Sequence, residues 1–96
     1  MNSENIIEQL ANLTAPTMDM HRAIVTLSER LAELDNANQR IDACTDSSLM
    51  SILSATRESE KTNIAMLVEW MRRHDPKLDM ALRKALFKAG PIAGDD

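Results

Sequence analysis

The sequence predicts an all-α protein: a long antiparallel helical hairpin followed by a short C-terminal helix. Strong helix formers (Leu, Met, Ala, Glu, Lys and Arg) dominate the 96 residues. Both glycines, Gly90 and Gly94, lie near the C-terminus, so neither a glycine nor a proline interrupts a helix between Pro16 and Pro76. At this length we expect one domain over residues 1–96, with an N-terminal segment at 1–14 and a tail at 91–96.

The first long helix is expected from about residue 16 to 44. Thr14 suits the N-cap position, with Pro16 inside the first turn. Apolar residues then recur at alternating spacings of four and three, the a/d seam of a coiled-coil-like bundle. This seam consists of Met20, Ile24, Leu27, Leu31, Leu34 and Ile41, with the polar Asn38 at one position.

The second helix is expected from about residue 47 to 74, capped by Thr45, Asp46 or Ser47. Its seam consists of Leu53, Thr56, Glu60, Asn63, Leu67 and Trp70. The Asp75-Pro76 pair ends this helix and starts a third, which we expect to end at Gly90.

Two thin helices of this length leave apolar surface uncovered, including Val25, Ile64, Met66 and Met71. A second copy would cover it by forming a four-helix bundle across a two-fold axis. The sequence therefore predicts an obligate homo-oligomer based on a homodimer.

Composition excludes several classes of function. The net charge is −4 and the only aromatic residues are Trp70 and Phe87, which argues against nucleic-acid binding. No apolar run is long enough to span a membrane, and the acidic, polar N-terminus resembles neither a signal nor a transit peptide. The single Cys44 suits a reducing interior, so a cytoplasmic location is expected.

Glu60 and Asn63 lie one turn apart on the seam of the second helix. A Glu-x-x-His pair at this spacing is an iron-binding arrangement, but an amide here replaces the imidazole. A carboxylate in a seam needs either a metal or a counter-ion, and Arg30 on the first helix could supply the positive charge. Glu29 and Glu33 share a face of the first helix and are most simply explained as a solvated pair. His21 and His74 could meet at the open end of the hairpin, without further ligands around them.

The chain resembles the encapsulated ferritins, small iron-oxidising proteins that work inside encapsulin shells. The resemblance covers roughly residues 17–92. It rests on the segments HRAIV (21–25), QRIDACTD (39–46), LMSIL (49–53), EK (60–61), AMLVEWMRR (65–73) and LRKALFKAGPI (82–92). It implies hairpins paired into a four-helix bundle with a metal site at the interface, and dimers joined into a ring, a decamer.

The same resemblance implies that the iron site has been lost. The family pattern Glu-Glu-Leu-Glu-Ala-Val-Asp-Trp-Tyr corresponds here to residues 29–37, so that Arg30 replaces a ferroxidase glutamate. The Trp-Tyr pair becomes Asn36-Ala37, and Glu29 is what remains of an outer carboxylate pair. Of the three principal ligands only Glu60 remains, since Asn63 replaces the histidine.

We therefore expect a degenerate ferroxidase site in which Arg30 and Glu60, from one subunit or from two, form a salt bridge completed by Asn63. No cofactor is expected, and the function would be structural or accessory in iron storage. The alternative is an active ferroxidase with a rebuilt carboxylate site that uses iron through Glu60, Glu29 and Glu33.

The resemblance also raises an encapsulin shell and an active paralogue as partners. Encapsulated members usually carry a C-terminal extension that docks on the shell, whereas this sequence stops at GPIAGDD. Three explanations stay open: no encapsulation, a trimmed chain, or transport with a tagged partner.

Overall fold

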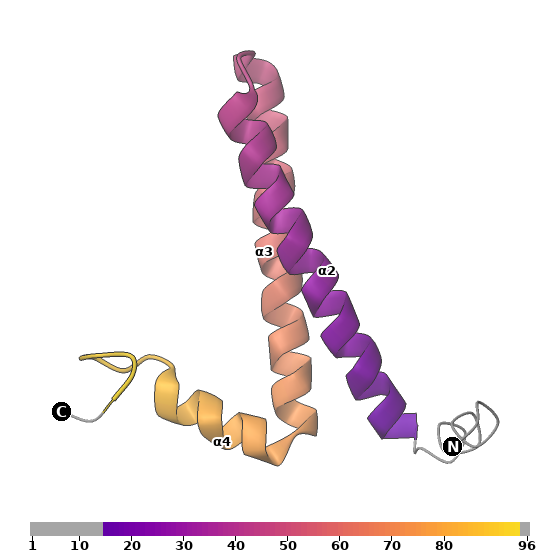
Figure 1. Cartoon of the computed structure of the whole chain (residues 1–96), viewed down its shortest axis with the longest axis vertical. Coiled ribbons are helices and arrows are strands. Elements are labelled where there is room, and N and C mark those ends of the chain that lie inside the picture. Colours follow the sequence, from indigo (N-terminus) through magenta and orange to yellow (C-terminus); the bar gives the residue numbers. More distant parts are fainter. Residues whose placement is uncertain (1–14, 95–96) are drawn as a thin grey trace, which may run out of the picture.

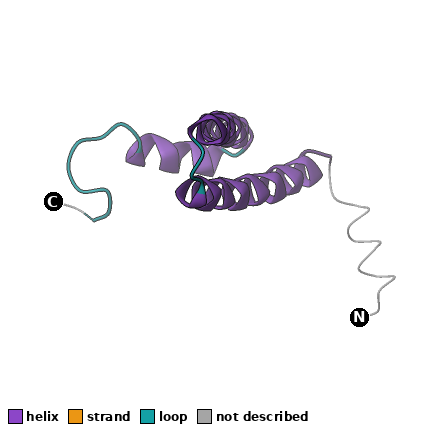
Figure 2. Cartoon of the chain, turned by 90° about the horizontal axis from the view of Figure 1, so that it is seen from above, coloured by secondary structure: helices purple, strands orange, loops and turns teal. Residues whose placement is uncertain are grey.

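The computed structural model describes residues 15–94 and contains three helices in this range. Helices α2 (Ala15–Ala43) and α3 (Ser47–His74) form an antiparallel hairpin, and α4 (Pro76–Ala85) follows directly. Figure 1 shows α2 and α3 side by side near their connecting loop and diverging toward the open end, where α4 projects away from the hairpin. The view from above shows the same divergence (Figure 2). The predicted all-α hairpin with a short third helix is confirmed.

The helix starts follow the local chemistry of the sequence. Asp46 is the N-cap of α3, and its Oδ2 accepts a hydrogen bond from the Leu49 backbone N–H at 2.7 Å. Asp75 caps α4 by accepting from the backbone N–H groups of Lys77 and Leu78, both at 3.0 Å, with Pro76 in the first turn. The expected cap at Thr14 lies outside the described residues.

The predicted end of the third helix at Gly90 is wrong, because α4 ends five residues earlier at Ala85. Leu86 leaves the helical conformation with φ −82° and ψ 144°, and its N–H still donates to the Leu82 carbonyl at 2.8 Å. Phe87 then takes a positive φ of 58°. A bulky residue is uncommon in this left-handed conformation, which a glycine normally adopts just after a helix. The search for such a glycine therefore placed the end of the helix at Gly90, beyond its true end.

On α2, every second position of the predicted seam is wrong by one residue. Ala23, Arg30 and Ala37 face α3 in place of the predicted Ile24, Leu31 and Asn38. Within residues 16–94 the buried side chains are Ala23 and Ala37, at 8% and 6% exposure, whereas Ile24 and Leu31 are 47% and 48% exposed. Ala23 and Ala37 flank Arg30 at intervals of seven residues, on the face of α2 that meets α3. Small residues allow two helices to approach closely, and a search for large apolar residues overlooks them.

On α3 the predicted seam is correct at five half-buried positions, Leu53, Glu60, Asn63, Leu67 and Trp70, but Thr56 is exposed. The neighbouring Arg57 is half-buried instead, and its Nη1 donates to Asn38 Oδ1 of α2 at 3.3 Å. The polar position that the sequence placed in the α2 seam is thus bonded across the hairpin.

Candidate functional site: an arginine where a cation ligand was expected

The structure brings Arg30, Glu60 and Asn63 together inside one chain. Arg30 projects from the middle of α2 toward α3, and its Nη1 lies 3.3 Å from Glu60 Oε2 and 3.4 Å from Oε1. Asn63 lies one turn after Glu60, and its Nδ2 is 3.5 Å from Glu60 Oε1. Glu60 is the more buried partner, with a side chain 13% exposed against 34% for Arg30.

The Arg30–Glu60 contact is loose. Charge-assisted N–H···O bonds are usually about 2.7–2.9 Å long, and arginine normally grips a carboxylate with two nitrogens. Here both carboxylate oxygens share the single nitrogen Nη1, at distances beyond that range. Among the described residues, the Nε and Nη2 groups of Arg30 have no hydrogen-bond partner.

The remaining predicted residues lie apart from this group. Glu33 forms an ion pair with Arg40 at 3.6 Å on α2, and Glu29 is exposed and forms no ion pair within the described chain. Asn36 is exposed, whereas Ala37 is buried in the hairpin contact. Over residues 15–94, no three His, Cys, Asp or Glu side chains gather closely enough to hold a metal ion.

His21 and His74 do line one depression at the open end of the hairpin, together with Asp75. The ring of His74 stacks on Trp70 with centroids 4.1 Å apart, and its Nδ1 lies 2.7 Å from the Trp70 carbonyl oxygen. Asp75 is already engaged in capping α4. His74 therefore has partners within α3, whereas His21 makes no side-chain hydrogen bond, ion pair or ring contact among the described residues.

A tighter network, which sequence reasoning did not find, joins α3 to α4. Arg72 grips both oxygens of Glu69 at 2.7 Å and also bonds Asp79 of α4. Arg73 adds a 2.6 Å bond to Glu69, and Arg83 bonds Asp79 at 3.0 Å. The spacing of Glu69 from Arg72 and Arg73 was a usable signal, but the Arg72–Asp79 contact depends on the turn at the proline.

These arginines shift the acidity of the carboxylates they bind. Hydrogen bonds from Arg72 and then Arg73 lower the pKa of Glu69 to about 2. Hydrogen bonds from Arg72 and then Arg83 lower the pKa of Asp79. Both carboxylates are therefore fully ionised near neutral pH, and the network joining α3 to α4 is charged.

The fold and the central carboxylate position define a ferritin-like helical hairpin. The family model described as EncFtn-like matches residues 5–89. An encapsulated ferritin-like protein of Rhodospirillum rubrum is 44% identical over 91 residues, which is 95% of this chain and 65% of that protein. The chain therefore belongs to the EncFtn-like family, and the resemblance to encapsulated ferritins is confirmed.

Two further proteins are similar to this chain, one in sequence and one in structure. A ferritin-like protein of Thermotoga maritima is 36% identical over 85 residues, covering 88% of this chain and 75% of that one. A crystal structure of a Nitrosomonas europaea protein aligns with a TM-score of 0.82 at 47% identity, over 88% of this chain and 93% of the other. In residues 15–94, no helix is both long and apolar enough to cross a membrane.

Proposed function

We propose that this protein has lost ferroxidase activity and serves a structural or accessory role in iron storage. The observation that carries the proposal is the Arg30 guanidinium, 3.3 Å from the one principal iron-ligand position that is still a glutamate, Glu60. The family resemblance implies a glutamate at the position of Arg30 and a histidine at that of Asn63.

The residues present do not fit an iron ion as substrate. Arginine stays protonated at any accessible pH and offers only donors. At about 4 Å and an effective dielectric near 20, each unit charge on a cation would be repelled by roughly 4 kcal/mol. Asn63 contributes a neutral amide, a poorer iron ligand than imidazole or carboxylate, and its Nδ2 is directed to Glu60.

The alternative, a ferroxidase rebuilt on carboxylates, needs Glu29 and Glu33 to act with Glu60. Glu33 is paired with Arg40 on α2. Recruiting it would break that contact, and Arg30 would still stand beside Glu60. The arrangement thus favours loss of activity over reconstruction.

We propose further that a second copy covers the exposed apolar residues of the hairpin. Ile24 and Leu31 on α2, and Ile52 and Met66 on α3, are 47%, 48%, 63% and 59% exposed. Burying them supplies the favourable free energy that a two-helix layer lacks. This dimer would form a four-helix bundle, with a ring of dimers as the larger assembly implied by the family.

The R. rubrum relative is named as encapsulated. By analogy we propose an encapsulin shell, or mixed rings with an active paralogue, as the setting for the accessory role.

Anaerobic Fe(II) titration of the purified oligomer, read by native mass spectrometry and followed by oxygen, tests the proposal. We expect no stoichiometric uptake and no oxidation above the protein-free rate. Stoichiometric uptake per dimer with rapid oxidation would overturn it and would establish the rebuilt ferroxidase. The same spectra give the number of subunits.

A gain-of-function pair sharpens the test. The double variant Arg30→Glu, Asn63→His restores the donor types that the family resemblance implies, and we expect it to gain Fe(II) binding. Arg57→Glu is the matched control, because it makes the same charge change at another half-buried arginine that crosses the hairpin. Binding gained equally by both variants would show that overall negative charge, not the position, attracts the metal.

A further inference from the structure

The Arg30–Glu60 pair lies at the centre of the hairpin along its length. Helix α2 spans Ala15–Ala43 and α3 spans Ser47–His74, so each of the two residues lies within one residue of the middle of its helix. In an interface with two-fold symmetry, a residue near the axis meets its own copy on the other subunit. A two-fold axis through the middle of the hairpin therefore brings two copies of this pair together.

Exposed apolar side chains border the pair on both sides along α3. Ile52 precedes Glu60 and is 63% exposed, and Met66 follows Glu60 and is 59% exposed. Ile52 and Met66 are separated by about four helical turns, which places both on one face of α3. A second copy that covers both residues must also cover the middle of the hairpin, where Arg30 meets Glu60.

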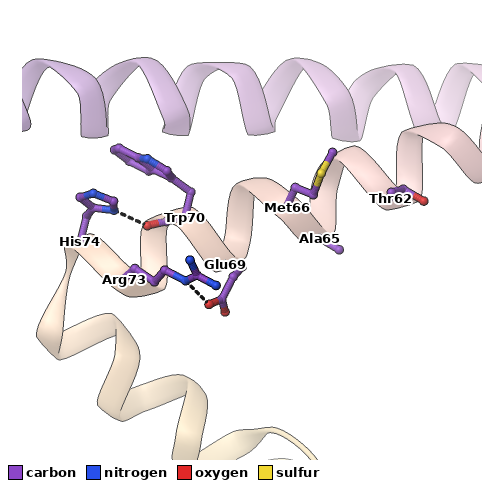
Figure 3. Close-up of a pocket in the computed structure, with 7 residues that line it drawn as sticks. All are labelled: Thr62, Ala65, Met66, Glu69, Trp70, Arg73 and His74. Carbon is purple, nitrogen blue, oxygen red and sulfur yellow. Dashed lines mark hydrogen bonds and ion pairs between the residues drawn. The ribbon is translucent and has the colours of Figure 1, made fainter.

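A depression beside Arg30 opens on this same face. It is lined by Thr26, Arg30, Asn63, Met66, Leu67 and Trp70. Figure 3 shows the side chains of Met66 and Trp70 directed from α3 toward α2. A second copy that packs on Met66 would thus bring its own side chains close to the guanidinium of Arg30.

Both members of the central pair have hydrogen-bonding capacity that a single chain leaves unused. Arg30 contacts Glu60 through Nη1 alone, and its Nε and Nη2 have no partner among the described residues. Glu60 accepts only contacts of 3.3–3.5 Å, from Arg30 and Asn63, although a carboxylate has about four acceptor positions. Covering this face removes water from both charges, which is costly unless further hydrogen bonds form.

We propose that a charged network of four residues joins the two subunits at the centre of the dimer, which is the dimer proposed above to cover the hairpin. Each Arg30 would keep its own Glu60 on Nη1 and bond Glu60 of the partner subunit through Nε and Nη2. That second contact has the two-nitrogen geometry that arginine and carboxylate favour. Two positive and two negative charges alternate around the network, so it is neutral without any bound ion. The partner subunit thus completes a site that one chain leaves partly bonded.

Charge reversal tests whether the network crosses the interface. Arg30→Glu leaves only carboxylates at the centre of its homodimer, and Glu60→Arg leaves only cations there. Because like charges repel and opposite charges attract, we expect each variant to dimerise at least about tenfold more weakly than wild type and their mixture to form the heterodimer. Analytical ultracentrifugation gives the dissociation constants, and native mass spectrometry of metal-free samples gives the composition of the dimers.

The exposed ion pair of Lys61 and Glu58 provides the matched control. Its atoms lie 3.2 Å apart, and the side chains are 53% and 59% exposed on the same helix as Glu60. Lys61→Glu and Glu58→Lys should each dimerise like wild type, and their mixture should contain the dimers in statistical proportions. Statistical proportions in the mixture of the Arg30 and Glu60 variants as well would overturn the network.

A milder variant covers the case in which a charge-reversal variant does not fold, as judged by circular dichroism. Arg30→Gln removes the cation, and we expect the dimer dissociation constant to rise at least about tenfold. Arg57→Gln, at the other arginine that crosses the hairpin, should change it little. An unchanged dissociation constant in folded Arg30→Gln would overturn the proposal.

The outcomes separate this network from the proposed loss of activity. A monomeric wild-type protein would remove the dimer and the network, and the Fe(II) titration would still decide activity. A wild-type dimer whose variants mix statistically would remove the network alone. Preferred heterodimers in a protein that oxidises iron would support the network and remove the proposed inactivity.

Discussion

Two arginines hold carboxylates in this chain in contrasting ways. At the junction of α3 and α4, Arg72 grips Glu69 with two nitrogens at 2.7 Å and reaches Asp79 as well. In the middle of the hairpin, Arg30 meets Glu60 through one nitrogen at 3.3–3.4 Å. Arg72 thus bonds carboxylates with all three of its nitrogens. Arg30 bonds Glu60 with one nitrogen only, at the position where the family resemblance implies a metal ligand.

The two helix junctions also differ in the contacts that hold them together. Helix α4 contacts α3 alone among the described helices, and charged groups join the two. The α2–α3 contact relies on buried alanines with two polar crossings, Arg30–Glu60 and Arg57–Asn38. Packing should therefore dominate the stability of the hairpin, and charge should dominate the attachment of α4.

The largest expected loss of stability comes from overpacking the contact between α2 and α3. Ala37→Leu inserts three extra carbon atoms at a position that is 6% exposed, and overpacking of this kind typically costs about 1–3 kcal/mol. Denaturant unfolding followed by circular dichroism measures the loss. Ala32→Leu, at an exposed position on the same helix, is the control and should change stability little.

Removal of the N-cap of α4 should cause the second-largest loss of stability. Asp75→Ala leaves two backbone N–H groups without their acceptor and should cost about 0.5–2 kcal/mol, concentrated in α4. Faster amide hydrogen exchange at residues 77–85, with α2 unaffected, is the expected result. Uniformly faster exchange in all three helices would contradict the view that α4 is a separately attached unit.

Lysine replacement compares the two arginines directly. Arg72→Lys cannot bond both oxygens of Glu69 while reaching Asp79, so we expect a measurable loss of unfolding free energy and faster exchange in α4. Arg30→Lys retains a single-nitrogen contact to Glu60 and should cost less than about 0.5 kcal/mol. A larger loss at Arg30 than at Arg72 would reverse the comparison.

Acid should weaken the α3–α4 junction selectively. Arginine contacts lower the pKa of Glu69 from its ordinary value of 4.5 to about 2 in the folded chain. The ionised carboxylate thus stabilises the fold fully above pH 4.5, and this contribution is lost as the pH falls from 4.5 toward 2. Amide NMR shifts in α4 should change within that window, and Glu69→Gln should remove the part of the change that Glu69 causes while leaving the part that Asp79 causes.

Much of the fold follows from local sequence. The boundaries of α2 and α3 agree with those expected, because Asp46 and the Asp75-Pro76 pair act through their immediate neighbours. The early end of α4 did not follow, since Leu86 and Phe87 carry no glycine signal for the conformations they adopt.

The sequence by itself determined the all-α hairpin, its turns and the unusual residue set at the centre, because helix propensity, capping and residue identity are local properties. Only the tertiary structure decided that Ala23 and Ala37 rather than Ile24 face α3, and that Arg30 approaches Glu60 within one chain while its Nε and Nη2 have no partner among the described residues. The physical reason is that the rotation of each helix about its axis and the distance between helices depend on close packing, which a heptad pattern of large residues does not specify.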